Sequence, residues 1–177
     1  FDYVGGEPER TQVELVSSVV RDKRPLGALL PAAEHVAQSG GTLRADRVLV
    51  WRNPGVGVGA SGEASRAELT ACVIRETRTY GGGNSGVGLA AERGAALRAV
   101  GVLVEGNTSV GVVAVGSATQ AEITGCAIRG TRPTAAGYWG RALESNGGAF
   151  VRATATLMDH NAEIGVVALD ATTRLVL

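Results

Sequence analysis

The amino-acid sequence repeats itself every 54 residues, and a regular period of this length restricts the chain to repeat architectures. The segment "ELTACVIRETR" at 68–78 agrees with "EITGCAIRGTR" at 122–132 in seven of eleven positions. A more diverged third copy, "ELVSSVVRDKR", lies at 14–24. The whole chain is therefore expected to consist of similar structural units.

Each period of 54 residues divides into two half-repeats. One begins at Gly57 and Gly111, and the other begins at Gly86 and Gly140. The spacing predicts about six units that alternate between 29 and 25 residues. They are expected to form one domain, 1–177, as a fragment of a longer chain, with repeats at 3–56, 57–110 and 111–164 and a partial repeat at 165–177.

Within a unit, apolar and polar residues alternate. In "AELTACVIRET" the apolar residues are Ala67, Leu69, Cys72 and Ile74, with one extra residue before Cys72. A period of two predicts short strands joined by a bend and does not fit the 3.6-residue period of a helix. Three strands per unit follow, near 58–60, 67–70 and 72–75. Stacked units place equivalent residues about 4.8 Å apart in parallel sheets, so the sequence predicts an all-β parallel β-helix.

Stacking converts equivalent positions into columns, if one residue of slack is allowed in every other unit. One outward column alternates in charge: Glu14, Arg44, Glu68, Arg98, Glu122, Arg152. A second alternates except at its tryptophan: Arg21, Trp51, Arg75, Glu105, Arg129, Asp159. An inward column alternates large and small residues: Leu15, Ala45, Leu69, Ala99, Ile123, Ala153. A polar column is expected at a turn: Asn53, Thr77, Asn107, Thr131, Asn161. The recurring segment is thus interpreted as architecture.

The turns that end each third strand read "VWRN", "IRET", "VEGN", "IRGT" and "MDHN", and are often followed by "GVG" or "GVV". This pattern resembles the right-handed parallel β-helix repeat proteins of the pectate-lyase-like superfold. That group spans polysaccharide lyases and hydrolases, phage tailspikes, adhesins and bacterial secreted repeat proteins. The resemblance implies a right-handed β-helix and an extracellular or cell-surface location.

Charge and hydropathy exclude two classes of partner. Lysine and arginine together number 17, as do aspartate and glutamate, so no basic surface for nucleic acid is expected. No apolar run approaches the ~20 residues of a membrane-spanning helix.

No residue pattern predicts catalysis, a metal or a cofactor. In "MDHN", Asp159 continues a charge column and His160 occupies a turn, while the other histidine, His35, belongs to a different unit. The carboxylates show no local pairing of the kind that a glycosidase or a calcium-dependent lyase needs, although carboxylates from separate coils can still converge. The glycine-rich stretch at 80–86 lacks the Lys-Ser or Lys-Thr of a phosphate loop.

Long loops are the candidate binding sites. Every second unit carries eight residues before the next unit begins, at 24–31, 78–85 and 132–139. Loops on a solenoid commonly carry its function. The predicted ligand-binding side chains are Arg24, Arg78, Tyr80, Arg132, Tyr138 and Trp139. The alternative is that these arginines and aromatics only cover the end of a sheet.

Two functional hypotheses follow. The first is a non-catalytic module of a secreted or surface protein that acts as a rigid spacer or binds a polysaccharide or another protein chain. The second is a polysaccharide lyase or glycoside hydrolase of the β-helix type. The apolar interior is expected to be open at both ends, which implies end-to-end or capped assembly. Cys72 and Cys126 are expected to be free thiols, because two coils separate them by about 9.6 Å.

Overall fold

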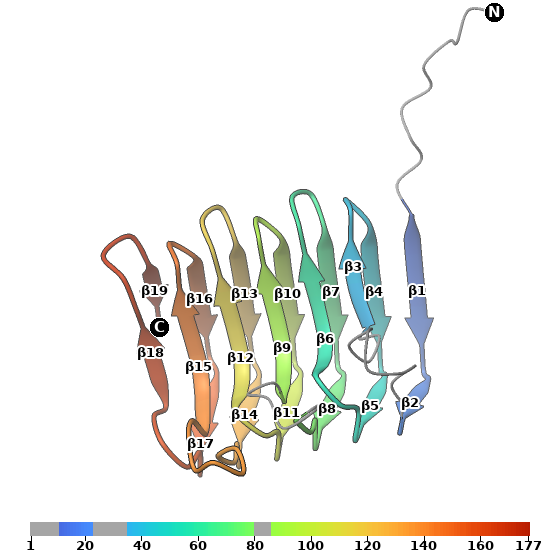
Figure 1. The fold of residues 1–177 in the computed structure, drawn as a ribbon. Helices are drawn as coiled ribbons and strands as arrows, with labels where there is room; N and C mark the ends of the chain where they lie inside the picture. Colours follow the sequence, from blue (N-terminus) through green and yellow to red (C-terminus); the bar gives the residue numbers. More distant parts are fainter. Residues whose placement is uncertain (1–10, 23–34, 80–85) are drawn as a thin grey trace, which may run out of the picture.

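A computed structural model describes residues 11–22, 35–79 and 86–177. These residues wind into a right-handed parallel β-helix, in which successive coils lie side by side (Figure 1). The described part contains strands, turns and loops but no helix, and so none long and apolar enough to cross a membrane. The predicted fold class is confirmed.

Three parallel sheets run along the stack, and each coil contributes one strand to each. Sheet A pairs β1 (Gln12–Val16), β4 (Thr42–Asp46), β7 (Arg66–Thr70), β10 (Ala96–Val100), β13 (Gln120–Thr124), β16 (Phe150–Thr154) and β19 (Arg174–Val176). Sheet B pairs β2 (Val19–Arg21), β5 (Leu49–Trp51), β8 (Val73–Arg75), β11 (Leu103–Glu105), β14 (Ala127–Arg129) and β17 (Leu157–Asp159). Sheet C pairs β3 (His35–Gln38), β6 (Val56–Ser61), β9 (Val87–Glu92), β12 (Val110–Val115), β15 (Arg141–Asn146) and β18 (Val166–Ala168).

The strand register confirms the predicted columns. Arg98 pairs with Glu68 on one side and Glu122 on the other, and Glu105 lies between Arg75 and Arg129. The unit lengths differ from the expected 29 and 25. Paired residues are alternately 30 and 24 positions apart in sheets A and B, and 31 and 23 apart in sheet C. The two intervals add up to 54 in every sheet.

The interior follows from the alternation of residues along each strand. Inward side chains such as Leu69 and Ile123 are 1% exposed and belong to one continuous apolar core. Small residues lie between them in the column, since Ala99 pairs with both. Alternating large and small side chains lets neighbouring coils interdigitate at the density of a protein interior.

Left-handed backbone closes the corners of every described coil between sheets A and B and between sheets B and C. The corner between A and B, here the A/B corner, has positive φ at Ser17, Arg47, Ala71, Gly101, Gly125 and Ala155. The corner between B and C, the B/C corner, has positive φ at Asp22, Arg52, Glu76, Gly106, Gly130 and His160, here called the B/C left-handed column. The same backbone turn is thus built mostly from small residues at one corner, and from charged residues, glycines and a histidine at the other.

Cys72 and Cys126 line the inside of the A/B corner as buried, free thiols, as expected. Val102 lies between them, since its amide donates to Cys126 Sγ and Leu103 N donates to the carbonyl of Cys72. Burial raises the pKa of both thiols.

Candidate functional site

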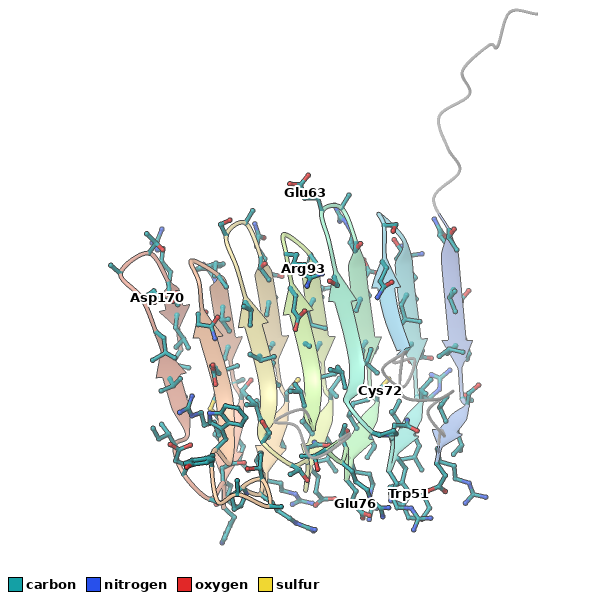
Figure 2. The ribbon with its side chains drawn as sticks, viewed as in Figure 1. Trp51, Glu63, Cys72, Glu76, Arg93 and Asp170 are labelled. Carbon is teal, nitrogen blue, oxygen red and sulfur yellow. The ribbon has the colours of Figure 1, made fainter. Side chains whose placement is uncertain are left out.

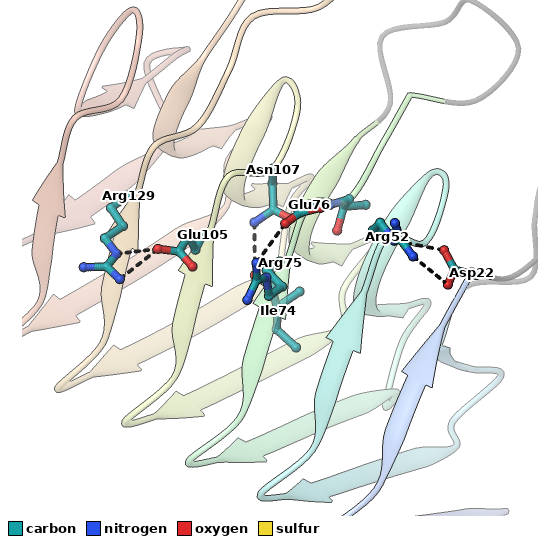
Figure 3. A network of polar contacts seen from close by, with 9 residues as sticks. Asp22, Arg52, Ile74, Arg75, Glu76, Glu105, Asn107 and Arg129 are labelled. Atoms are coloured by element: carbon teal, nitrogen blue, oxygen red, sulfur yellow. Dashed lines mark hydrogen bonds and ion pairs between the residues drawn. The ribbon is translucent and has the colours of Figure 1, made fainter.

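A ladder of buried asparagine and threonine residues holds the inside of the B/C corner. Asn107 is fully buried, and its Oδ1 accepts a 2.8 Å hydrogen bond from the amide of Thr77. Its Nδ2 donates to the carbonyl of Ile74 at 3.2 Å, as Figure 3 shows. Two coils further along the stack, Asn161 makes the equivalent bonds to Thr131 and Ile128 of its neighbouring coil. The predicted polar column therefore links neighbouring coils and supplies an acceptor for the buried amides of Thr77 and Thr131.

Glycine follows the ladder because the chain passes too close to the core for a side chain. A Cβ at Gly111 would lie 2.4 Å from Ile128 Cγ2 and 2.7 Å from the carbonyl oxygen of Ala142. The first glycine of the repeated "GVG" and "GVV" motifs therefore indicates close packing at this corner.

The outside of the same corner is rich in charge. Trp51, which interrupts the second charge column, lies under two guanidinium groups: that of Arg52 at 4.1 Å and that of Arg75 at 5.7 Å from the ring centroid. Arg52 also pairs with Asp22 and Arg75 with Glu76 (Figure 3). The aromatic face thus replaces the acid that the alternation would require.

Glu76 is the acid that binds Arg75 (Nη2 to Oε1, 2.9 Å). This hydrogen bond lowers the pKa of Glu76, and the positive charge of Arg132 acts in the same direction. Figure 2 shows Glu76 and Trp51 near each other along the lower edge of the view, which is the B/C corner.

An open hollow of about 610 Å³ lies further along this corner. The B/C left-handed column carries glycine at 106 and 130, so two consecutive coils lack a side chain there. The hollow is lined by Arg75, Glu76, Glu105, Gly106, Arg129, Gly130, Arg132, Asp159 and His160. Arg129 is held by Glu105 at 2.8 Å, and His160 Nδ1 lies 2.6 Å from Asp159 Oδ2. We call this feature the glycine hollow.

Arginines of the predicted binding set lie beside the glycine hollow. Backbone bridges place Arg78 next to Pro54 and Arg132 next to Thr108. Because Thr108 N also bonds to the carbonyl of Thr77, one column runs Pro54, Arg78, Thr108, Arg132, here called the arginine column. Arg78 and Arg132 are both exposed and two strand spacings apart, about 9.6 Å. Arg24 and Tyr80, from the same predicted set, lie outside the described residues.

The loop at 132–139 presents the two predicted aromatic residues that the structure describes. It closes on itself, since Thr134 N donates to the carbonyl of Tyr138 and Gly137 N donates to that of Thr134. Tyr138 is 65% exposed, whereas Trp139 is half-buried and has a positive φ of 66°. Tyr138 is therefore the accessible ring of this loop.

A polar cluster that sequence reasoning missed follows this loop. Arg141 donates to Glu144 (2.9 Å) and to Glu163 (3.0 Å), and Asn146 donates to Glu144 (2.8 Å). The bond to Glu163 is the main cause that raises the pKa of Arg141. The sequence does carry an indication of this cluster. Arg141 departs from the repeat, because the residue 54 positions before it is Val87.

Sheet A, the other charged surface, shows fewer contacts than its register allows. Arg44 pairs with Glu68 at 3.0 Å. Within the described part of the chain, no ion pair shorter than 4.0 Å joins Arg98 to Glu68 or Glu122. These exposed charges face one another across strands without being held together.

The described ranges contain no group of three or more histidine, cysteine, aspartate or glutamate residues able to hold a metal ion. No family model matches the sequence, and no curated protein or solved structure is similar enough to count as a match. The site must therefore be interpreted from its own geometry.

Proposed function

We propose that the protein is a non-catalytic β-helix module of a secreted or cell-surface protein, and that it binds an extended acidic polysaccharide along the arginine column. The observation that carries this proposal is the position of Arg78 and Arg132. Both are exposed, they share one column, and no described acidic residue forms an ion pair with either.

The chemistry of this surface suits a charged sugar chain. Arginine binds carboxylates through two parallel N–H groups, and aromatic rings offer broad apolar faces to pyranose rings. Tyr138 supplies an exposed ring in the loop that begins at Arg132. At every second coil a buried or half-buried asparagine bonds to the preceding coil inside this corner, so the arginines are presented on a rigid scaffold.

The test is a titration with an acidic polysaccharide at low and moderate salt. We expect Arg78→Ala/Arg132→Ala to weaken binding about tenfold or more, and high salt to weaken it further, because exposed charges are screened within about 8 Å. Tyr138→Ala removes the exposed ring of the loop and should also weaken binding, whereas Trp139→Ala removes the half-buried ring beside it and should weaken binding less. The matched control is Arg98→Ala/Arg152→Ala, which removes the same charge from sheet A.

Equal losses in the two arginine double variants would show attraction by overall charge and contradict the proposed site. Release of shortened products from the polysaccharide during the titration would contradict a non-catalytic module and favour a polysaccharide lyase or hydrolase.

A further inference from the structure

The glycine hollow and the arginine column run along the same coils. The hollow is lined by residues of β8, β11, β14 and β17 or by residues that directly follow these strands. The arginine column passes Arg78 just after β8 and Arg132 just after β14. A polymer that crosses the coils at this corner therefore contacts both features.

Positive charge in the arginine column falls on every second coil. Arg78 and Arg132 alternate with the uncharged Pro54 and Thr108. Neighbouring coils are about 4.8 Å apart, and a pyranose ring in an extended chain advances by a similar distance. Consecutive arginines thus meet alternate sugars of a bound chain.

The walls of the glycine hollow carry acids as well as arginines. Glu76, Glu105 and Asp159 each have a basic partner, but a carboxylate offers about four acceptor sites and the contacts present use only some of them. The remaining sites can accept hydrogen bonds from sugar hydroxyls. Three arginines, Arg75, Arg129 and Arg132, line the hollow beside these three acids, so its charges balance. The hollow therefore favours an uncharged, hydroxyl-rich sugar.

Room for that sugar comes from Gly106 and Gly130. Arg52, Glu76 and His160 show that the same left-handed turn accepts a side chain elsewhere in the column. A Cβ at Gly106 would point toward Arg132, whose Nη2 would lie 3.6 Å away. Gly106 thus leaves the space beside Arg132 open to the hollow.

From these observations we infer that the ligand is an alternating polysaccharide with a carboxylate on every second sugar, and that the glycine hollow holds an uncharged sugar beside Arg132. This inference rests on the proposed function. It adds the charge pattern of the ligand and the subsite that selects it.

The first experiment compares probes of equal length at one ionic strength: a hyaluronan oligosaccharide, with one carboxylate per disaccharide, an alginate oligosaccharide, with one on every sugar, and dextran sulfate. We expect hyaluronan to bind at least about tenfold more tightly than the other two. Attraction by charge alone predicts the reverse order.

The second experiment fills the hollow. Gly106→Asn adds a side chain inside it, and asparagine tolerates the left-handed conformation. Gly101→Asn is the matched control, because Gly101 has the same φ of 62° at the A/B corner of the same coil and no atom lies within 4 Å of a Cβ there. We expect Gly106→Asn to weaken hyaluronan binding about tenfold or more and Gly101→Asn to leave it unchanged.

The outcomes separate the two proposals. Binding of alginate or dextran sulfate as tight as that of hyaluronan would overturn the alternating ligand and leave the proposed function standing. Equal affinities of the two asparagine variants would overturn the subsite. Absence of binding to all three polysaccharides would overturn the proposed function together with the inference.

Discussion

The A/B and B/C corners use the same backbone turn for different ends. Both have a column of left-handed residues outside and a column of small or polar residues inside. At the A/B corner the outside is mostly alanine, serine and glycine, and cysteine and valine fill the inside. At the B/C corner charged residues and long loops are outside, and hydrogen-bonded asparagines are inside. The comparison shows that conformation alone does not mark a site, whereas the side chains placed on that conformation do.

The largest contrast concerns chemical access to the A/B corner. Cys72 and Cys126 are buried and their raised pKa values disfavour the reactive thiolate. We expect alkylation by iodoacetamide to be slowed at least about a thousandfold in the native protein relative to the protein in urea, because labelling requires opening of a coil. Intact mass measured over time checks this. Rapid labelling of the native protein, or a Cys72–Cys126 bridge, would contradict the described corner.

A stability comparison tests the inside of the two corners. Asn107→Ala at the B/C corner leaves the buried amide of Thr77 without its acceptor and removes the hydrogen bond to the carbonyl of Ile74. We expect the free energy of unfolding to fall by about 2–4 kcal/mol. Cys126→Ala at the A/B corner removes only a small apolar group and weak sulfur contacts, and should lower it by about 1 kcal/mol. Urea denaturation of both variants gives the comparison, and equal midpoints would show that the ladder adds nothing.

Sheet A provides a weaker test of charge. Arg98→Glu would place three like charges in a row with Glu68 and Glu122. We expect it to lower the free energy of unfolding by about 0.5–1 kcal/mol more than Arg98→Ala does. Identical urea midpoints for the two variants would mean that the alternation of charge has no energetic role.

The smallest expected effect is the pH dependence from Glu76. Its pKa lies below the ordinary value of 4.5, so the bond to Arg75 adds stability above pH 4.5, which is lost as the pH falls through the lower, folded pKa. Because the side chains of Arg75 and Glu76 are 41% and 30% exposed, solvent screens the pair and we expect about a few tenths of a kcal/mol. The loss of stability between pH 7 and pH 3 should be smaller by this amount in Glu76→Gln than in the wild type, as urea denaturation at both pH values can show. An equal loss in the two proteins would mean that Glu76 contributes nothing to the pH dependence.

The sequence predicts the columns well because their physical causes are local. Alternation along "AELTACVIRET" assigns Leu69 and Ile74 to the core, and the 54-residue period assigns their partners. Which of two neighbouring arginines an acid binds cannot be predicted in this way, because the choice depends on side-chain contacts between coils. Glu105 lies between Arg75 and Arg129 in the register but bonds only Arg129, because Arg75 turns to Glu76.

The candidate site was only partly predictable for a related reason. Arg78 and Arg132 share a column as expected, since that follows from the repeat. The glycine hollow depends on two positions of a column that carry no side chain, Gly106 and Gly130. The cluster around Arg141 depends on a departure from the repeat. Periodicity identifies what recurs, whereas specific surfaces arise where recurrence fails.

The alternation of asparagine and threonine has a consequence for how such a protein can change in length. If one coil, such as 86–110, were removed, Arg75 would meet Arg129, Leu69 would meet Ile123, and Thr77 would lose the side chain that accepts its amide hydrogen bond. Charge, volume and hydrogen bonding would all be mismatched at one junction. Removing or adding two coils restores the alternation of charge, volume and hydrogen bonding in these columns. The structure can therefore be shortened or extended by duplication and deletion only in whole pairs of coils, which makes the 54-residue segment its unit of inheritance and of engineering.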